Sequence, residues 1–119
     1  METLNEFKES LNSEQPGAGL SVQLKSLWYD AKGDWTQAHA QVDQLNDQDS
    51  ALVHAYLHRK EGDIWNADYW YHKANSVRPS ISLEEEWKQL VLQLSNIYKP
   101  EVLSVVGIII LSMPLNFAY

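Results

Sequence analysis

The chain has 119 residues, which gives room for one domain with a modest core. Its 16 acidic residues outnumber its 9 basic residues and leave a formal net charge of −7, so nucleic acid is excluded as an expected partner. No cysteine is present, which excludes disulfides, thiolate catalysis and zinc sites built on cysteine. The acidic first residues lack the basic-then-apolar order of a secretory signal, and we therefore expect a cytoplasmic protein of bacterial type.

A short leading helix is predicted at the start of the chain. Leu4, Phe7 and Leu11 share one helical stripe, and a proline and two glycines then interrupt the backbone. We assign residues 1–17 to this helix and its linker, and residues 18–98 to a helical-repeat domain.

A first helical hairpin is predicted between residues 20 and 45. Apolar residues recur at helical spacing from Leu20 to Ala31, and Gly33 can adopt the left-handed conformation that ends a helix. Asp34 can then cap the second helix of the hairpin. Ala38 lies one turn into that second helix, where a small side chain lets two helices cross closely.

Gly33, Asp34 and Ala38 belong to the pattern Gly-Asp-φ-x-x-Ala, in which φ is an apolar residue, and the same pattern occurs in a second hairpin. Gly62, Asp63 and Ala67 carry it, and Gly62 follows Gly33 by 29 residues (62 − 33). An internal repeat of this length is typical of stacked helical hairpins that serve as binding scaffolds. Pro79 ends the second hairpin.

Polar residues predict two further helix starts. Asp49 or Ser50 can cap the first helix of the second hairpin. Ser82 and Glu85 have the spacing of a capping box, and Trp87 begins the apolar face of a last helix.

The spacing of glycine, aspartate, alanine and the following bulky residues resembles the tetratricopeptide repeat over residues 20–79. The period of 29 residues is shorter than the roughly 34 residues of that repeat. The Leu-Gly pair of its first helix appears as Lys25-Ser26 in one copy and His54-Ala55 in the other. The resemblance implies an all-α fold of two antiparallel helical hairpins with a C-terminal amphipathic capping helix and an apolar tail.

The second copy also resembles a family of small bacterial proteins. The resemblance lies in the segment VHAYLHRKEGD at residues 53–63 and in NADYWY at residues 66–71. It implies no particular activity.

Basic side chains near the second hairpin turn suggest a surface for a peptide. Tetratricopeptide grooves can hold the terminal carboxylate of a peptide with basic residues, and the resemblance places Tyr56, Arg59 and Lys60 on the comparable surface. The alternative is ordinary solvation of these charges, or a salt bridge from Arg59 to Asp30 or Asp63.

Trp65, Tyr69 and His72 lie on a helix face displaced from the apolar stripe of the second hairpin. Either the last helix covers them through Trp87 and Leu90, or they form an exposed aromatic patch for a partner or a second subunit.

His54 and His58 are four residues apart on one helix, a spacing at which two imidazoles can share a metal ion. His72 or Asp68 could supply a third ligand. The alternative is that one histidine packs in the hairpin seam and the other faces water. We assign no metal and no cofactor, and we expect no enzyme because no phosphate loop, nucleophile elbow or catalytic triad spacing occurs.

Residues 99–119 form an apolar tail. From Val102 to Tyr119 no side chain carries a formal charge over 18 residues (119 − 102 + 1). This segment is at the lower limit for a membrane span, and a packed extra helix or an extension unrelated to the domain are the alternatives.

The sequence thus predicts a small protein-interaction module whose partner is a protein or peptide, including a second copy of itself. One alternative is a metal-binding protein or enzyme centred on His54, His58 and His72. The other is a membrane adaptor anchored through residues 102–119.

Overall fold

The structure, a computed structural model, describes residues 3–95. Over this range the chain forms six α-helices and no strand, which confirms the all-α prediction. The helices are α1 (Leu4–Ser10), α2 (Val22–Ala31), α3 (Trp35–Val42), α4 (Gln48–Glu61), α5 (Ile64–Lys73) and α6 (Leu83–Leu94).

The repeated Gly-Asp step ends one helix and begins the next in both hairpins. Gly33 and Gly62 have φ angles of 84° and 91°, in the left-handed region that glycine adopts without strain. Asp34 and Asp63 then cap α3 and α5, because each carboxylate accepts a backbone N–H three residues later. The hairpin turns therefore follow directly from the local sequence.

The other helix starts agree only in part with the prediction. Ser82 caps α6 and accepts the N–H of Glu85 at 3.0 Å, as expected. The predicted cap of α4 was wrong, because Asp47 accepts the N–H of Ser50 and thereby starts the helix earlier. Asp47 is the better cap because it is the residue with extended backbone geometry at this turn.

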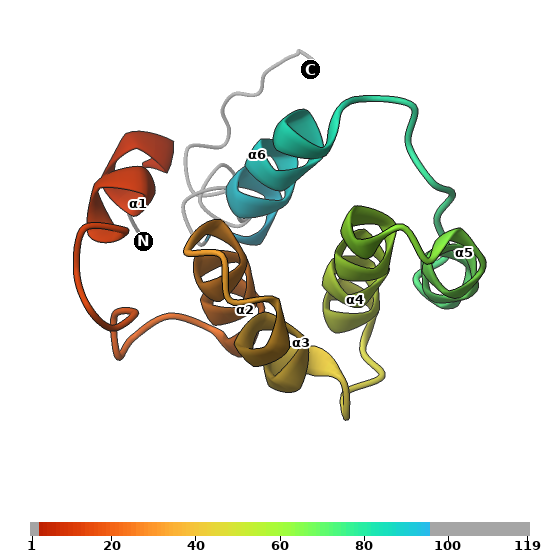
Figure 1. Ribbon diagram of the computed structural model, residues 1–119, viewed down its shortest axis with the longest axis horizontal. Coiled ribbons are helices and arrows are strands. Elements are labelled where there is room, and N and C mark those ends of the chain that lie inside the picture. Colours follow the sequence, from red (N-terminus) through yellow and green to blue (C-terminus); the bar gives the residue numbers. More distant parts are fainter. Residues whose placement is uncertain (1–2, 96–119) are drawn as a thin grey trace, which may run out of the picture.

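The helices pack as two pairs, and α6 lies against one helix of each pair, α2 and α4 (Figure 1). α2 pairs with α3, α4 pairs with α5, and α3 and α4 join the pairs. Ala38 and Ala67 are fully buried where the paired helices meet. The Oγ of Ser26 on α2 donates to the carbonyl of Ala38 on α3 at 2.7 Å, so these two backbones approach closely.

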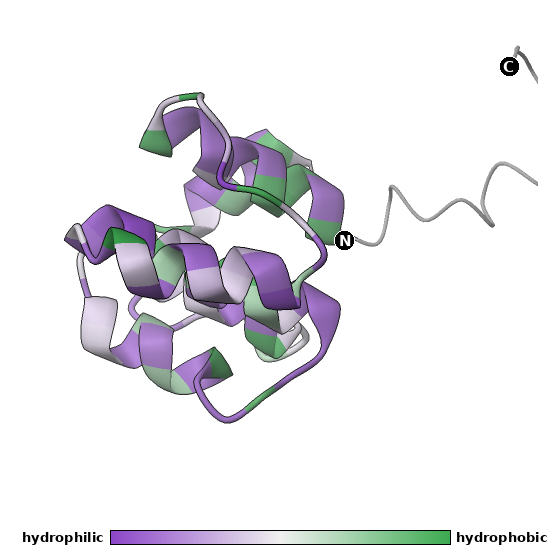
Figure 2. Cartoon of the chain, turned by 90° about the vertical axis from the view of Figure 1, so that its right-hand side faces the viewer, coloured by the Kyte–Doolittle hydropathy of each residue, from purple (hydrophilic) through white to green (hydrophobic). Residues whose placement is uncertain are grey.

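The main core collects apolar side chains from α1, α2, α3, α4 and α6. Phe7 of α1 is fully buried, and its ring lies 5.8 Å from the ring of Trp87 of α6. The leading helix is therefore part of the core of the main domain. Each helix mixes apolar and polar residues along its length, as expected of helices with one buried face (Figure 2).

No helix within residues 3–95 has the length and apolar character needed to cross a membrane. The hypothesis of a membrane anchor concerns residues 102–119, which lie outside the described part of the chain.

Candidate functional site

The surface predicted to bind a peptide carboxylate is covered by α6. The indole Nε1 of Trp87 on α6 donates to the carbonyl of Leu27 on α2 at 3.0 Å. Arg59 on α4 donates from Nη1 to Oε1 of Glu86 on α6 at 2.6 Å and also hydrogen-bonds the carbonyl of Ile81. Arg59 thus holds a carboxylate, but the carboxylate belongs to the same chain.

Lys60 is likewise paired with a carboxylate of the same chain, on α2. Its Nζ lies 2.9 Å from Oδ1 of Asp30, a carboxylate on α2 that is almost fully buried. Tyr56 donates its hydroxyl to Oδ2 of Asp30 at 2.7 Å and is only 2% exposed. The placement of Tyr56 in a partner-binding surface is therefore incorrect, since α6 and its neighbours bury the ring.

Two buried tyrosines share this hydrogen-bonding arrangement. The hydroxyl of Tyr71 donates to Oε2 of Glu86 at 2.7 Å, as that of Tyr56 does to Asp30. Burial, together with the adjacent carboxylate, raises the pKa of both phenols well above the usual range. Both hydroxyls therefore remain donors, and the two carboxylates are each held by one tyrosine and one cation.

A cavity of about 490 Å³ lies where α1, α2, α4 and α6 meet. Its lining is mostly apolar and includes Leu11, Leu83 and Trp87. The lining also includes Asp30 and Lys60, but these two groups are already paired with each other.

The outer face of α5 is an exposed aromatic surface. Trp65 is 80% exposed and Tyr69 is 49% exposed, and their rings stack with 6.5 Å between centroids. Lys73 places its Nζ 5.7 Å from the ring centroid of Tyr69. The alternative that the last helix covers these rings was wrong, because Trp87 of α6 faces the main core instead. We call Ile64, Trp65, Tyr69 and Lys73 the aromatic face.

Three histidines lie together between α3 and α4. His39 comes from α3, and His54 and His58 come from successive turns of α4. Nε2 of His39 lies 3.0 Å from Nε2 of His54, and the three residues each offer a ligand nitrogen within 4.8 Å of the others. We call these residues the histidine cluster. The predicted third member, His72, is exposed on α5 and takes no part in the cluster.

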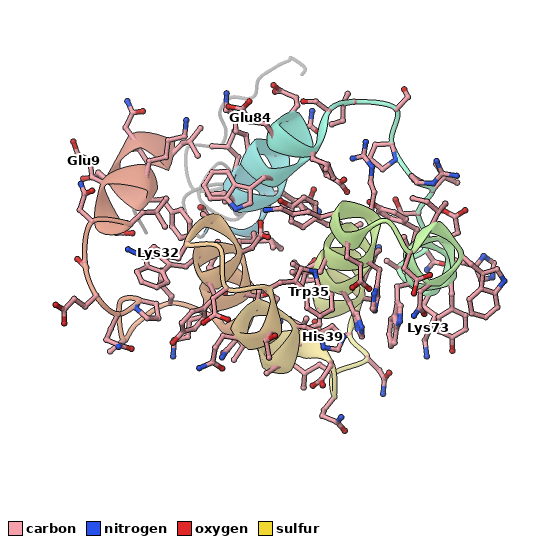
Figure 3. The ribbon with its side chains drawn as sticks, in the orientation of Figure 1. Glu9, Lys32, Trp35, His39, Lys73 and Glu84 are labelled. Atoms are coloured by element: carbon pink, nitrogen blue, oxygen red, sulfur yellow. The ribbon has the colours of Figure 1, made fainter. Side chains whose placement is uncertain are left out.

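Two tryptophans enclose the histidine cluster. Trp35 stacks on His39 with 4.7 Å between ring centroids, and Figure 3 shows both side chains on α3. The indole Nε1 of Trp35 donates to the carbonyl of Leu57 at 2.9 Å, which fixes the ring against α4. On the other side Trp70 of α5 stacks on His54 at 4.0 Å.

The imidazoles of the cluster have unusual protonation chemistry. Burial, reinforced by the neighbouring histidines, lowers the pKa of His54 to about 4. Burial also lowers the pKa of His39, and His58 adds to this effect. The neutral form of both rings therefore predominates at pH 7, and one Nε2 donates its hydrogen to the other across the 3.0 Å contact. Nδ1 of His54 is buried and has no hydrogen-bond partner within the described residues.

Carboxylates flank two of the three rings. Nδ1 of His58 lies 2.7 Å from Oε2 of Glu61, a hydrogen-bond distance. Nδ1 of His39 lies 3.8 Å from Oδ2 of Asp43. The hydrogen bond to Glu61 leaves Nε2 of His58 as the free nitrogen of that ring.

Family models, curated proteins and solved structures were compared with the chain, and none matches it. The resemblances to tetratricopeptide repeats and to small bacterial proteins therefore stay predictions from the sequence. The function has to be inferred from the geometry of the aromatic face and the histidine cluster.

Proposed function

We propose that this chain is a small protein-interaction module that binds a partner protein through the aromatic face of α5. The observation that carries the proposal is the stacked pair of Trp65 and Tyr69 on the molecular surface. Tryptophan and tyrosine dominate the binding energy of protein interfaces, because they bury large apolar areas and lose few rotatable bonds on binding.

The aromatic face has a rigid base. On the opposite side of α5, Ala67 and Tyr71 are buried against α4, and Tyr71 also hydrogen-bonds Glu86. The backbone of α5 is therefore held in place before a partner arrives, which lowers the entropic cost of association.

The side chains of the aromatic face indicate which kind of protein segment would bind there. Ile64, the first residue of α5, is 38% exposed and adds apolar surface at the start of the helix. Lys73 adds a positive charge next to Tyr69. We therefore expect a protein segment with an apolar anchor for the rings and an acidic side chain for Lys73.

The proposal is tested by capture with matched variants of the full chain. The immobilised protein is exposed to an extract of its source cells, and bound proteins are compared for the wild type, a Trp65→Ser/Tyr69→Ser variant and a Val77→Ser variant. Val77 is a suitable control because it is also 80% exposed but lies beyond α5.

We expect a partner that the wild type and Val77→Ser retain and that the double variant loses. Light scattering of the purified protein tests a second copy of the chain as the partner in the same set of variants. Capture of every partner by the double variant, with no change in oligomeric state, would show that the interaction does not use α5.

A further inference from the structure

We propose that His39, His54 and His58 bind one divalent transition-metal ion of the zinc type through three imidazole nitrogens. A tetrahedral ion held by three protein ligands keeps its fourth position open for water or another ligand. This site shares no residue with the aromatic face.

The spacing of the nitrogens fits a shared ion. Two nitrogens on one tetrahedral zinc ion lie about 3.3–3.4 Å apart, because each Zn–N bond is about 2.0–2.1 Å long. Nε2 of His39 and Nε2 of His54 are already 3.0 Å apart. The third ligand nitrogen, from His58, lies within 4.8 Å of both, so three imidazole nitrogens are gathered in one place.

The chemistry of the donors also fits. Imidazole nitrogens are common ligands of zinc, and the three rings come from two neighbouring helices. Histidines that bind metal usually donate the other ring N–H to a carboxylate, which orients the ring and makes it a stronger ligand. Glu61 holds this position beside His58, and Asp43 lies near the corresponding nitrogen of His39.

Packing alone explains the histidine cluster less well. Apolar rings of similar size would fill the seam between α3 and α4 without burying polar nitrogen atoms. Here Nδ1 of His54 is buried and has no hydrogen-bond partner among residues 3–95, which costs stability. A polar cluster that is costly for the fold is typical of a functional site.

Calorimetric titration of Zn²⁺ into the metal-free full-length protein tests the site. The variants are His39→Ala, which removes a partly exposed ligand with little risk to the core, and Glu61→Gln, which changes only the carboxylate beside His58. His72→Ala is the matched control, because His72 is the one histidine of the chain outside the cluster. Circular dichroism shows that each variant is folded.

We expect one zinc ion per chain for the wild type and for His72→Ala. Glu61→Gln should bind zinc about 10- to 100-fold more weakly, the usual effect of losing a carboxylate behind a metal-bound histidine. His39→Ala should lose at least as much affinity. Bound Co²⁺ should give the intense visible absorption of tetrahedral coordination in the wild type and not in His39→Ala.

The absence of zinc binding by the wild type, or equal binding by folded His39→Ala, would overturn the site. The two proposals can fail separately, because the capture experiment on the aromatic face is repeated with a chelator that removes metal. A wild-type protein that captures its partner but binds no zinc overturns only the metal site.

Discussion

Removal of the guanidinium of Arg59 should be among the most damaging single changes in the described core. Arg59→Leu leaves the carboxylate of Glu86 without its cation, and the side chain of Glu86 is only 5% exposed. Loss of one partner of a buried ion pair costs about 3–5 kcal/mol of the free energy of unfolding. The variant also loses the hydrogen bond to the carbonyl of Ile81, while Tyr71 still donates to Glu86.

The double variant Arg59→Leu/Glu86→Leu tests how much of this cost comes from leaving Glu86 without its cation. Because it removes both charges, it should be more stable than Arg59→Leu alone, with a coupling free energy of about 0.5–3 kcal/mol between the two sites. Some cost remains because the hydroxyl of Tyr71 loses its acceptor.

Urea unfolding of the full-length chain at pH 7, followed by circular dichroism and tryptophan fluorescence, measures these differences. Arg78→Leu is the control, because Arg78 and its partner Asp68 are both largely exposed and the unfolding midpoint should not change. The reasoning is refuted if Arg59→Leu shifts the midpoint no more than Arg78→Leu, or if the double variant is no more stable than Arg59→Leu.

Three further variants test the local structure by the same unfolding assay. Gly62→Ala should cost about 1–2 kcal/mol, because alanine is strained at a φ of 91°, and an unchanged midpoint would contradict the left-handed turn. Ala67→Leu should cost about 1–3 kcal/mol by overpacking the fully buried contact of α5 with α4, and no effect would contradict the close crossing. Asp47→Ala should cost about 0.5–2 kcal/mol through loss of the α4 cap. Hydrogen bonds from Ser50 hold the pKa of Asp47 below its usual range, so this contribution should be present above the unfolded-state pKa and be lost as the pH falls through the folded-state value. Between pH 7 and pH 3, the difference in the free energy of unfolding between wild type and Asp47→Ala should therefore become smaller. A difference that stays constant would contradict the role of the ionised carboxylate as the cap.

The sequence predicts the hairpins well because their determinants are local. Gly33 and Gly62 need a left-handed backbone, and Asp34 and Asp63 reach only to the amides of the next turn. These interactions do not depend on the rest of the fold. The cap of α4 was misplaced because several polar residues compete in one turn, and only the observed backbone geometry selects Asp47.

The candidate sites were harder to predict because they depend on contacts between distant helices. The pair of His54 and His58 follows from helical spacing, but His39 joins it only through the packing of α3 on α4. Likewise, a repeat pattern shows which face of α4 carries Tyr56 and Arg59, but not that α6 lies over it. The sequence does contain one indication of the surroundings of His39. It lies four residues after Trp35, on the same face of its helix, and this spacing predicts that the two rings pack together.

Arg59 and Lys60 are consecutive residues of α4 that hold carboxylates on two different helices, Glu86 on α6 and Asp30 on α2. Successive residues of a helix point about 100° apart, since one turn takes 3.6 residues. A shift of α4 by one residue would therefore separate both ion pairs at once. The two pairs allow only one rotational setting of α4, and this setting turns His54 and His58 towards α3.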